Sequence, residues 1–126
     1  MPERLSAAVR ERFDATRFAL AAGQPGSQSL GSSGARAAGS LVQIHLWYGQ
    51  SIRARFRAYG DPATLAAADW ACEQVDGRPL PCDAPSVPEC ARALGLPGQR
   101  MHAASHAVAA LRDALAKLAG REPSLM

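Results

Sequence analysis

The sequence predicts an α+β fold in which helices pack on one face of a small, three-stranded antiparallel sheet. Three observations lead to this prediction. The chain opens with an amphipathic helical pattern, continues with alternating apolar residues at 41–48 and 51–59, and ends in further helical patterns. A third, shorter strand is expected near Leu30. With 126 residues and no internal repeat, the chain is expected to form one domain over residues 1–126.

The composition narrows the classes of protein to which the chain can belong. Its apolar runs all fall short of the ~20 residues that a membrane-spanning helix needs, so no membrane partner is expected. The N-terminal segment lacks the apolar stretch of a secretory signal, and we expect a cytoplasmic protein. Fourteen basic residues against 11 acidic residues give a net charge of +3, an excess too small to require a nucleic-acid partner.

The N-terminal third is expected to hold one helix followed by a flexible loop. Residues 3–20 repeat apolar side chains near helical spacing, with charged residues on the other side. Residues 21–40 are rich in Gly, Ser and Ala, and their few apolar side chains cannot offset the entropy of ordering the chain. We therefore expect a flexible loop over 21–40, with the short strand near Leu30 inside it.

The two clear strands surround Gly49-Gln50 and predict a β-hairpin. In the second strand, apolar residues alternate with a row of arginines, Arg53, Arg55 and Arg57. Such a row is most often a solvated strand face. It is also a candidate partner-binding surface, because three cations on one strand face can bind phosphate or an acidic protein.

The second half of the chain is expected to be helical. Asp61 is a suitable N-cap for a helix that starts at Pro62, and Gly77 is suited to end that helix. After a proline-rich connection, a short helix is predicted over about 87–94. The last helix is predicted over about 99–118, where apolar residues recur three and four positions apart.

The three cysteines, Cys72, Cys82 and Cys90, form no C-x-x-C pair. They indicate neither a disulfide framework nor a four-thiolate metal site. Cys72 lies on the apolar stripe of its helix and is expected to be a buried structural thiol. Cys82 and Cys90 lie in or beside the proline-rich connection, where either could be exposed and reactive, although an incidental thiol is the favoured interpretation.

Five fragments of the chain, taken in order, carry a family resemblance. Residues 54–60 read ARFRAYG, which is similar almost letter for letter to ARFKTYG, and residues 96–105 read LPGQRMHAAS beside LPPVKLHCSM. Residues 9–20, 41–44 and 77–80 supply the other three fragments. Together they resemble the IscU/NifU N-terminal family of iron–sulfur cluster assembly scaffolds over nearly the whole chain. The resemblance implies the same α+β fold and a role in cluster assembly.

The resemblance also locates the family's cluster-binding cysteines on this chain. The three cysteine positions fall on Arg36, Asp61 and Ala103, none of which carries sulfur. The family's neighbouring histidine is kept as His102, and the basic residue two positions before it is kept as Arg100, a further candidate for partner binding. Because iron–sulfur clusters are held mainly by thiolates, these degenerate positions cannot bind a cluster as the family does.

Asp61 and His102 are candidate ligands of a residual, weak Zn²⁺ or Fe²⁺ site, because carboxylate and imidazole both bind these metals. His106, one helical turn after His102, is a further candidate. Simpler alternatives are an N-cap role for Asp61 and packing or hydrogen bonding for His102. An ion pair between Arg36 and Asp61 would instead replace the metal altogether.

These observations predict a divergent scaffold-like protein and not an enzyme, because no nucleophile or base constellation accompanies Asp61 and His102. No cofactor is required; weak zinc or iron binding stays open, and the family implies an iron–sulfur cluster. The expected partner is a cysteine desulfurase or another iron–sulfur assembly protein, which the chain would bind as an accessory or regulatory module. The alternative is an arginine-striped adaptor for nucleic acid or an acidic protein partner.

Overall fold

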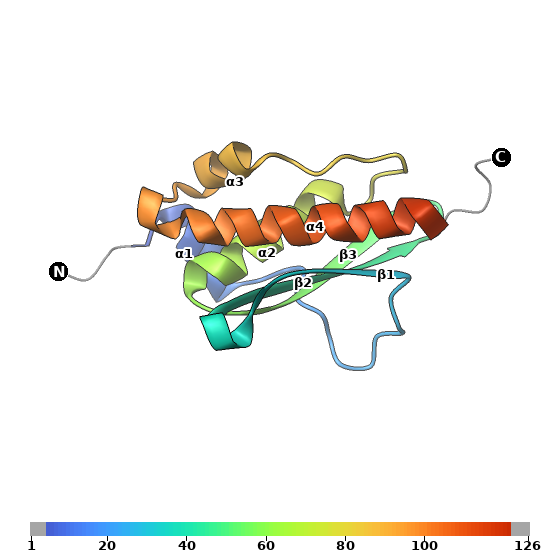
Figure 1. The fold of residues 1–126 in the computed structure, drawn as a ribbon, viewed down its shortest axis with the longest axis horizontal. Helices are drawn as coiled ribbons and strands as arrows, with labels where there is room; N and C mark the ends of the chain where they lie inside the picture. Colours follow the sequence, from blue (N-terminus) through green and yellow to red (C-terminus); the bar gives the residue numbers. More distant parts are fainter. Residues whose placement is uncertain (1–4, 122–126) are drawn as a thin grey trace.

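The computed structural model describes residues 5–121 and arranges them as four helices, three strands and two 3-10 turns. The order is helix, three strands, then helices, as the sequence predicts (Figure 1). No helix in this part of the chain is long and apolar enough to cross a membrane. The elements are α1 (Ala7–Asp14), β1 (Ser29–Ala35), the turn η1 (Arg36–Ala38), β2 (Ser40–Tyr48), β3 (Ile52–Tyr59), α2 (Pro62–Val75), α3 (Val87–Leu94), the turn η2 (Gly98–Arg100) and α4 (Met101–Arg121).

The sheet has the order β1-β2-β3 with antiparallel pairing throughout, so the predicted three-stranded sheet is confirmed. Helices α2 and α4 pack against one face of it (Figure 1). On β3, Ile52, Ala54 and Phe56 are buried beneath these helices, whereas Arg53 and Arg57 are exposed on the outer face. The alternating pattern of the sequence therefore assigns the two faces of this strand correctly.

Strand β1 is longer than the short strand expected inside a 21–40 loop. It pairs with β2 over its whole length, from Ser29 opposite Leu46 to Ala35 opposite Ser40. Its small residues are explained by the close approach of α4. A Cβ atom built on Gly31 would lie 1.9 Å from the carbonyl oxygen of Ala110. At residues 29–35, the Gly- and Ser-rich composition that indicated a loop therefore belongs to a strand that packs closely against α4.

Side chains of α4 also bind the free edge of β1. Lys117 Nζ donates to the carbonyl oxygen of Leu30 at 3.0 Å, and the amide of Ser32 donates to Asp113 Oδ2 at 3.3 Å. Lys117 and Asp113 form an ion pair at 3.1 Å, one helical turn apart. Backbone groups that a neighbouring strand would otherwise pair are therefore satisfied by the helix.

The first helix is shorter than the predicted 3–20 segment, of which residues 3 and 4 lie outside the described part. Helix α1 ends at Asp14, and the chain then turns toward the sheet. The buried carboxylate of Asp69 accepts hydrogen bonds from the amides of Arg17 and Phe18 at 2.8 and 2.9 Å. Residues 18–20 then exchange backbone hydrogen bonds with Phe56 of β3. These tertiary contacts override the local helical pattern.

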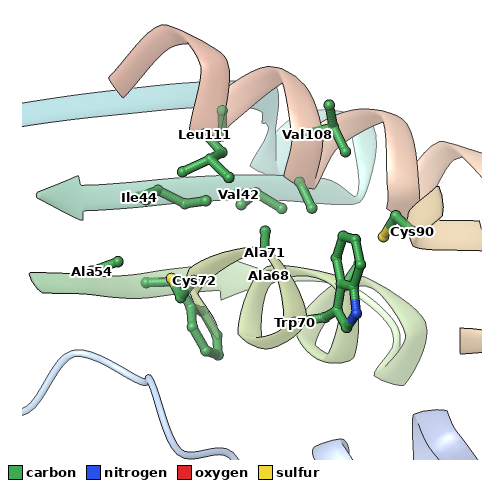
Figure 2. Packing of buried hydrophobic residues seen from close by; sticks show 14 of the residues in the cluster. Val42, Ile44, Ala54, Ala68, Trp70, Ala71, Cys72, Cys90, Val108 and Leu111 are labelled. Carbon is green, nitrogen blue, oxygen red and sulfur yellow. The ribbon is translucent and has the colours of Figure 1, made fainter. Parts of the chain in front are cut away.

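The remaining helices follow the sequence closely. Helix α2 begins at Pro62 behind the N-cap Asp61, and α3 spans Val87–Leu94 as predicted. Helix α4 starts at Met101, because residues 98–100 form the turn η2. In the core, Val108 and Leu111 of α4 point toward Val42 and Ile44 of β2 (Figure 2). The inner face of α4 also carries fully buried alanines: Ala103, Ala104, Ala107, Ala110 and Ala114.

Replacing Gly31 with alanine is expected to lower the free energy of unfolding by about 1–3 kcal/mol, the usual cost of an overpacked position. The added methyl group would overlap Ala110 and Ala114 and force α4 away from β1. Chemical denaturation followed by circular dichroism measures this change. Gly49→Ala is the matched control, because a Cβ atom at Gly49 meets no heavy atom within 4 Å. Equal stability of the two variants would contradict the packing argument.

Candidate functional site

The three positions that the resemblance aligns with the family's cysteines gather at one end of the molecule. Arg36 lies in η1 after β1, Asp61 caps α2 where β3 ends, and Ala103 lies in the first turn of α4. Figure 1 shows η1, the start of α2 and the start of α4 at the same end of the fold. Arg100 at the end of η2 and His102 at the start of α4 also lie at this end, and both contact Asp61.

Asp61 is the centre of this site, and its carboxylate is surrounded by donors. Asp61 Oδ1 accepts hydrogen bonds from the amide and the hydroxyl of Thr64, both at 2.9 Å. Asp61 Oδ2 is paired with the guanidinium of Arg100, and His102 Nε2 lies 3.7 Å away. Partial burial raises the pKa of Asp61, but the hydrogen bonds from Thr64 and the charge of Arg100 outweigh this and lower it. Asp61 therefore holds its charge while forming an N-cap and an ion pair.

Arg36 does not form the ion pair with Asp61 that was considered from the sequence. Its guanidinium carbon lies 5.0 Å from the ring centroid of Tyr59, a cation–π arrangement at the outer face of the sheet. Arg100 is the cation that pairs with Asp61 instead. The sequence marked Arg100 only as a candidate for partner binding, because pairing between residues 39 positions apart in sequence depends on how α4 packs.

Ala103 and the two histidines complete this end of the fold. Ala103 is fully buried and contributes only a methyl group to the core. The rings of His102 and His106 meet edge to face, with centroids 6.4 Å apart. His106 Nδ1 is hydrogen-bonded to Ser33 Oγ at 2.9 Å. Over residues 5–121, no group of three or more His, Cys, Asp or Glu side chains could hold a metal ion. A two-ligand site at Asp61 and His102 stays a prediction.

None of the three cysteines falls on a position that the resemblance aligns with a cluster ligand. Cys72 is fully buried, as predicted, and burial raises the pKa of its thiol well above the ordinary value. Cys90 is fully buried as well, so the expectation that it could be exposed is wrong; burial raises its pKa to about 12. Cys90 lies on the inner face of α3, so its side chain is in the core. Cys82 is partly exposed, with a pKa raised by burial. Burial thus keeps Cys72 and Cys90 protonated and unreactive.

The row of arginines on β3 is not a uniform cationic surface. Arg55 pairs with Asp76 at 3.1 Å, and its guanidinium carbon lies 5.4 Å from the centroid of Phe18. Arg53 lies over the ring of Trp47 at 5.0 Å. Arg57 is exposed on the same face. Pairing of the middle arginine weakens the interpretation of this row as an adaptor surface.

Sequence reasoning missed two residues that support the site. Thr64 gives Asp61 two hydrogen bonds, and its position three residues after an N-cap could have indicated the first of them. Ser33, which bonds His106, lies in a segment interpreted as a loop, and no local signal marked it.

Asp61→Asn is expected to lower stability at neutral pH by about 1 kcal/mol or less, because asparagine keeps the cap but loses the charge that faces Arg100. The pKa of Asp61 is depressed below its ordinary value of 3.8. The charge therefore stabilises the fold above that value, and this contribution is lost as pH falls through the folded-state pKa. Thermal denaturation should show the gap between wild type and variant closing in acid. Asp83→Asn, at an exposed carboxylate, should show no such gap, and a pH-independent gap at Asp61 would contradict the assignment.

Comparisons with known proteins cover most of the chain. Among solved structures, it is similar to a candidate iron–sulfur cluster assembly scaffold protein for the SUF system from the thermophile Fervidobacterium islandicum AW-1, with a TM-score of 0.62 and 13% identity over 87% of this chain and 95% of that one. At this identity the likeness supports the fold alone. Among curated proteins, nothing matches. The family described as NifU-like N terminal domain matches residues 11–124. The chain therefore belongs to the NifU-like N-terminal domain family.

Proposed function

We propose that this chain is a non-enzymatic accessory module of iron–sulfur cluster assembly, which keeps the scaffold fold but does not itself hold a cluster. Membership of the NifU-like N-terminal domain family links it to cluster assembly. The cluster is the cargo of such scaffolds, and it requires thiolate ligands. Arg36, Asp61 and Ala103 supply none at the corresponding positions.

The observation that carries this proposal is the saturated carboxylate of Asp61. Thr64 and Arg100 already bind its two oxygens. An incoming Fe²⁺ or Zn²⁺ ion would have to displace the Arg100 guanidinium and would meet its positive charge. At the other two ligand-equivalent positions, Arg36 offers a cation and Ala103 offers a methyl group. This supports a site in which a charge pair replaces the metal.

The partner we propose is a cysteine desulfurase, which donates sulfur to scaffolds of this family. A homologue with the same fold and no acceptor thiolate can occupy the docking surface of that enzyme without receiving sulfur. By occupying that surface, this chain would regulate the access of a thiol-bearing scaffold to the desulfurase. His102, with 43% of its side chain exposed, and Arg100, with 29% exposed, present polar groups at this end for contact.

Anaerobic incubation with ferrous iron and sulfide tests the loss of cluster binding. Wild-type protein is expected to retain no acid-labile sulfide and no visible chromophore after desalting, because its site has no thiolate. The triple variant Arg36→Cys/Asp61→Cys/Ala103→Cys restores three sulfur ligands at the same end of the fold and is expected to gain both signals. Stoichiometric acid-labile sulfide on the wild-type chain would contradict the proposal.

Binding to the desulfurase of the same organism tests the accessory role. Biolayer interferometry with the purified enzyme should give saturable binding, and Arg100→Ala should weaken it about tenfold through loss of a polar contact at the docking surface. Arg112→Ala is the control, since Arg112 is an exposed residue about three turns further along α4. The control should bind as wild type does. Absence of binding by correctly folded wild-type protein would rule out this partner.

A further inference from the structure

A second candidate site lies on the outer face of the sheet, beside η1. It is a hollow of about 360 Å³ lined by Arg36, Leu41, Gln43, Arg57, Ala58 and Tyr59. This face is opposite to the one on which α2 and α4 pack. None of the lining residues is acidic, and two of the six are arginines.

The register of the sheet brings the lining side chains together. Gln43 of β2 is directly opposite Arg57 of β3, and Leu41 is opposite Tyr59. Arg36 reaches the hollow from η1, with its guanidinium 5.0 Å from the Tyr59 ring centroid. Two guanidinium groups therefore approach one hollow from different elements, one from a strand and one from a turn.

The donors in this hollow lack acidic partners. Within residues 5–121, no carboxylate lies within 4.0 Å of the guanidinium of Arg36 or Arg57, in contrast to Arg55 and Arg100. A concave surface with unpaired cations concentrates anions.

We propose that this hollow binds the phosphoryl group of a small molecule, with Arg36 and Arg57 as its two cationic contacts. A planar carboxylate is satisfied by one arginine fork, whereas a phosphoryl group offers three oxygens to donors from several directions. The volume of about 360 Å³ is at the lower end of small-ligand pockets. Gln43 adds an amide donor, and Leu41 adds apolar surface for the rest of the ligand.

Titration of the ¹⁵N-labelled full chain tests this site by NMR. Inorganic phosphate and glycerol 3-phosphate are the phosphoryl probes, glutarate is the carboxylate probe, and sodium chloride holds ionic strength constant. Saturable amide shifts centred on Gln43 and Arg57 are expected with both phosphoryl probes at millimolar concentrations. Tighter binding of glycerol 3-phosphate would assign the site to an organic monoester, and tighter binding of inorganic phosphate would assign it to the free ion; both support the proposal.

Variants separate a built site from a generally basic face. Arg57→Gln and Arg36→Gln should each raise the dissociation constant about tenfold, because each removes one charged contact. Arg53→Gln, on the same face but outside the hollow, should change it less than about twofold, because Arg53 lies four strand residues from Arg57, roughly 13 Å away, where salt screens its charge. Shifts that do not saturate, equal weakening in all three variants, or tighter binding of glutarate would each overturn the proposal. Circular dichroism confirms that each variant is folded before titration.

Discussion

The direct contact between α4 and the sheet is the constraint on which the rest of this structure depends. It is made by residues with little or no side chain: Gly31 on β1, and Ala110 and Ala114 on α4. Because the helix lies so close, its N-terminal end is carried to the turn between β3 and α2. For that reason Arg100 and His102 reach Asp61. The contacts of Asp61 therefore depend on the close packing between the middle of α4 and β1.

The contacts at this end of the fold are charge pairing and hydrogen bonding around Asp61. The carboxylate of Asp61 forms an N-cap and pairs with a cation on another element. Arg36 lies apart from Asp61, at the outer face of the sheet, where its guanidinium stacks on Tyr59. Of the three positions that the resemblance aligns with cysteines, Asp61 caps a helix, Ala103 belongs to the core, and Arg36 lines a separate surface. Backbone contacts away from this site, such as that of α4 with Gly31, position the three elements.

Local patterns predicted the elements that local physics controls. The alternation on β3 and the Asp61-Pro62 helix start were confirmed, because burial and capping act within a few residues. The end of α1 and the full length of β1 could not be predicted, because both depend on distant partners, namely Asp69 and α4. The burial of Cys90 and the Arg100–Asp61 pair were missed for the same reason. The resemblance located the three ligand-equivalent positions, but the conformations of their side chains required the structure.

The contacts from α4 to β1 have a consequence for how copies of this chain meet. An edge strand with free amides and carbonyls can be extended by a second molecule, which begins intermolecular sheet growth. Here Lys117, the only lysine in the sequence, and Asp113 engage the backbone of Leu30 and Ser32 on that edge. At the opposite edge, residues 18–20 bond to Phe56. At both edges of the sheet, the chain's own side chains and backbone therefore bind edge groups, which hinders pairing with a strand of a second molecule.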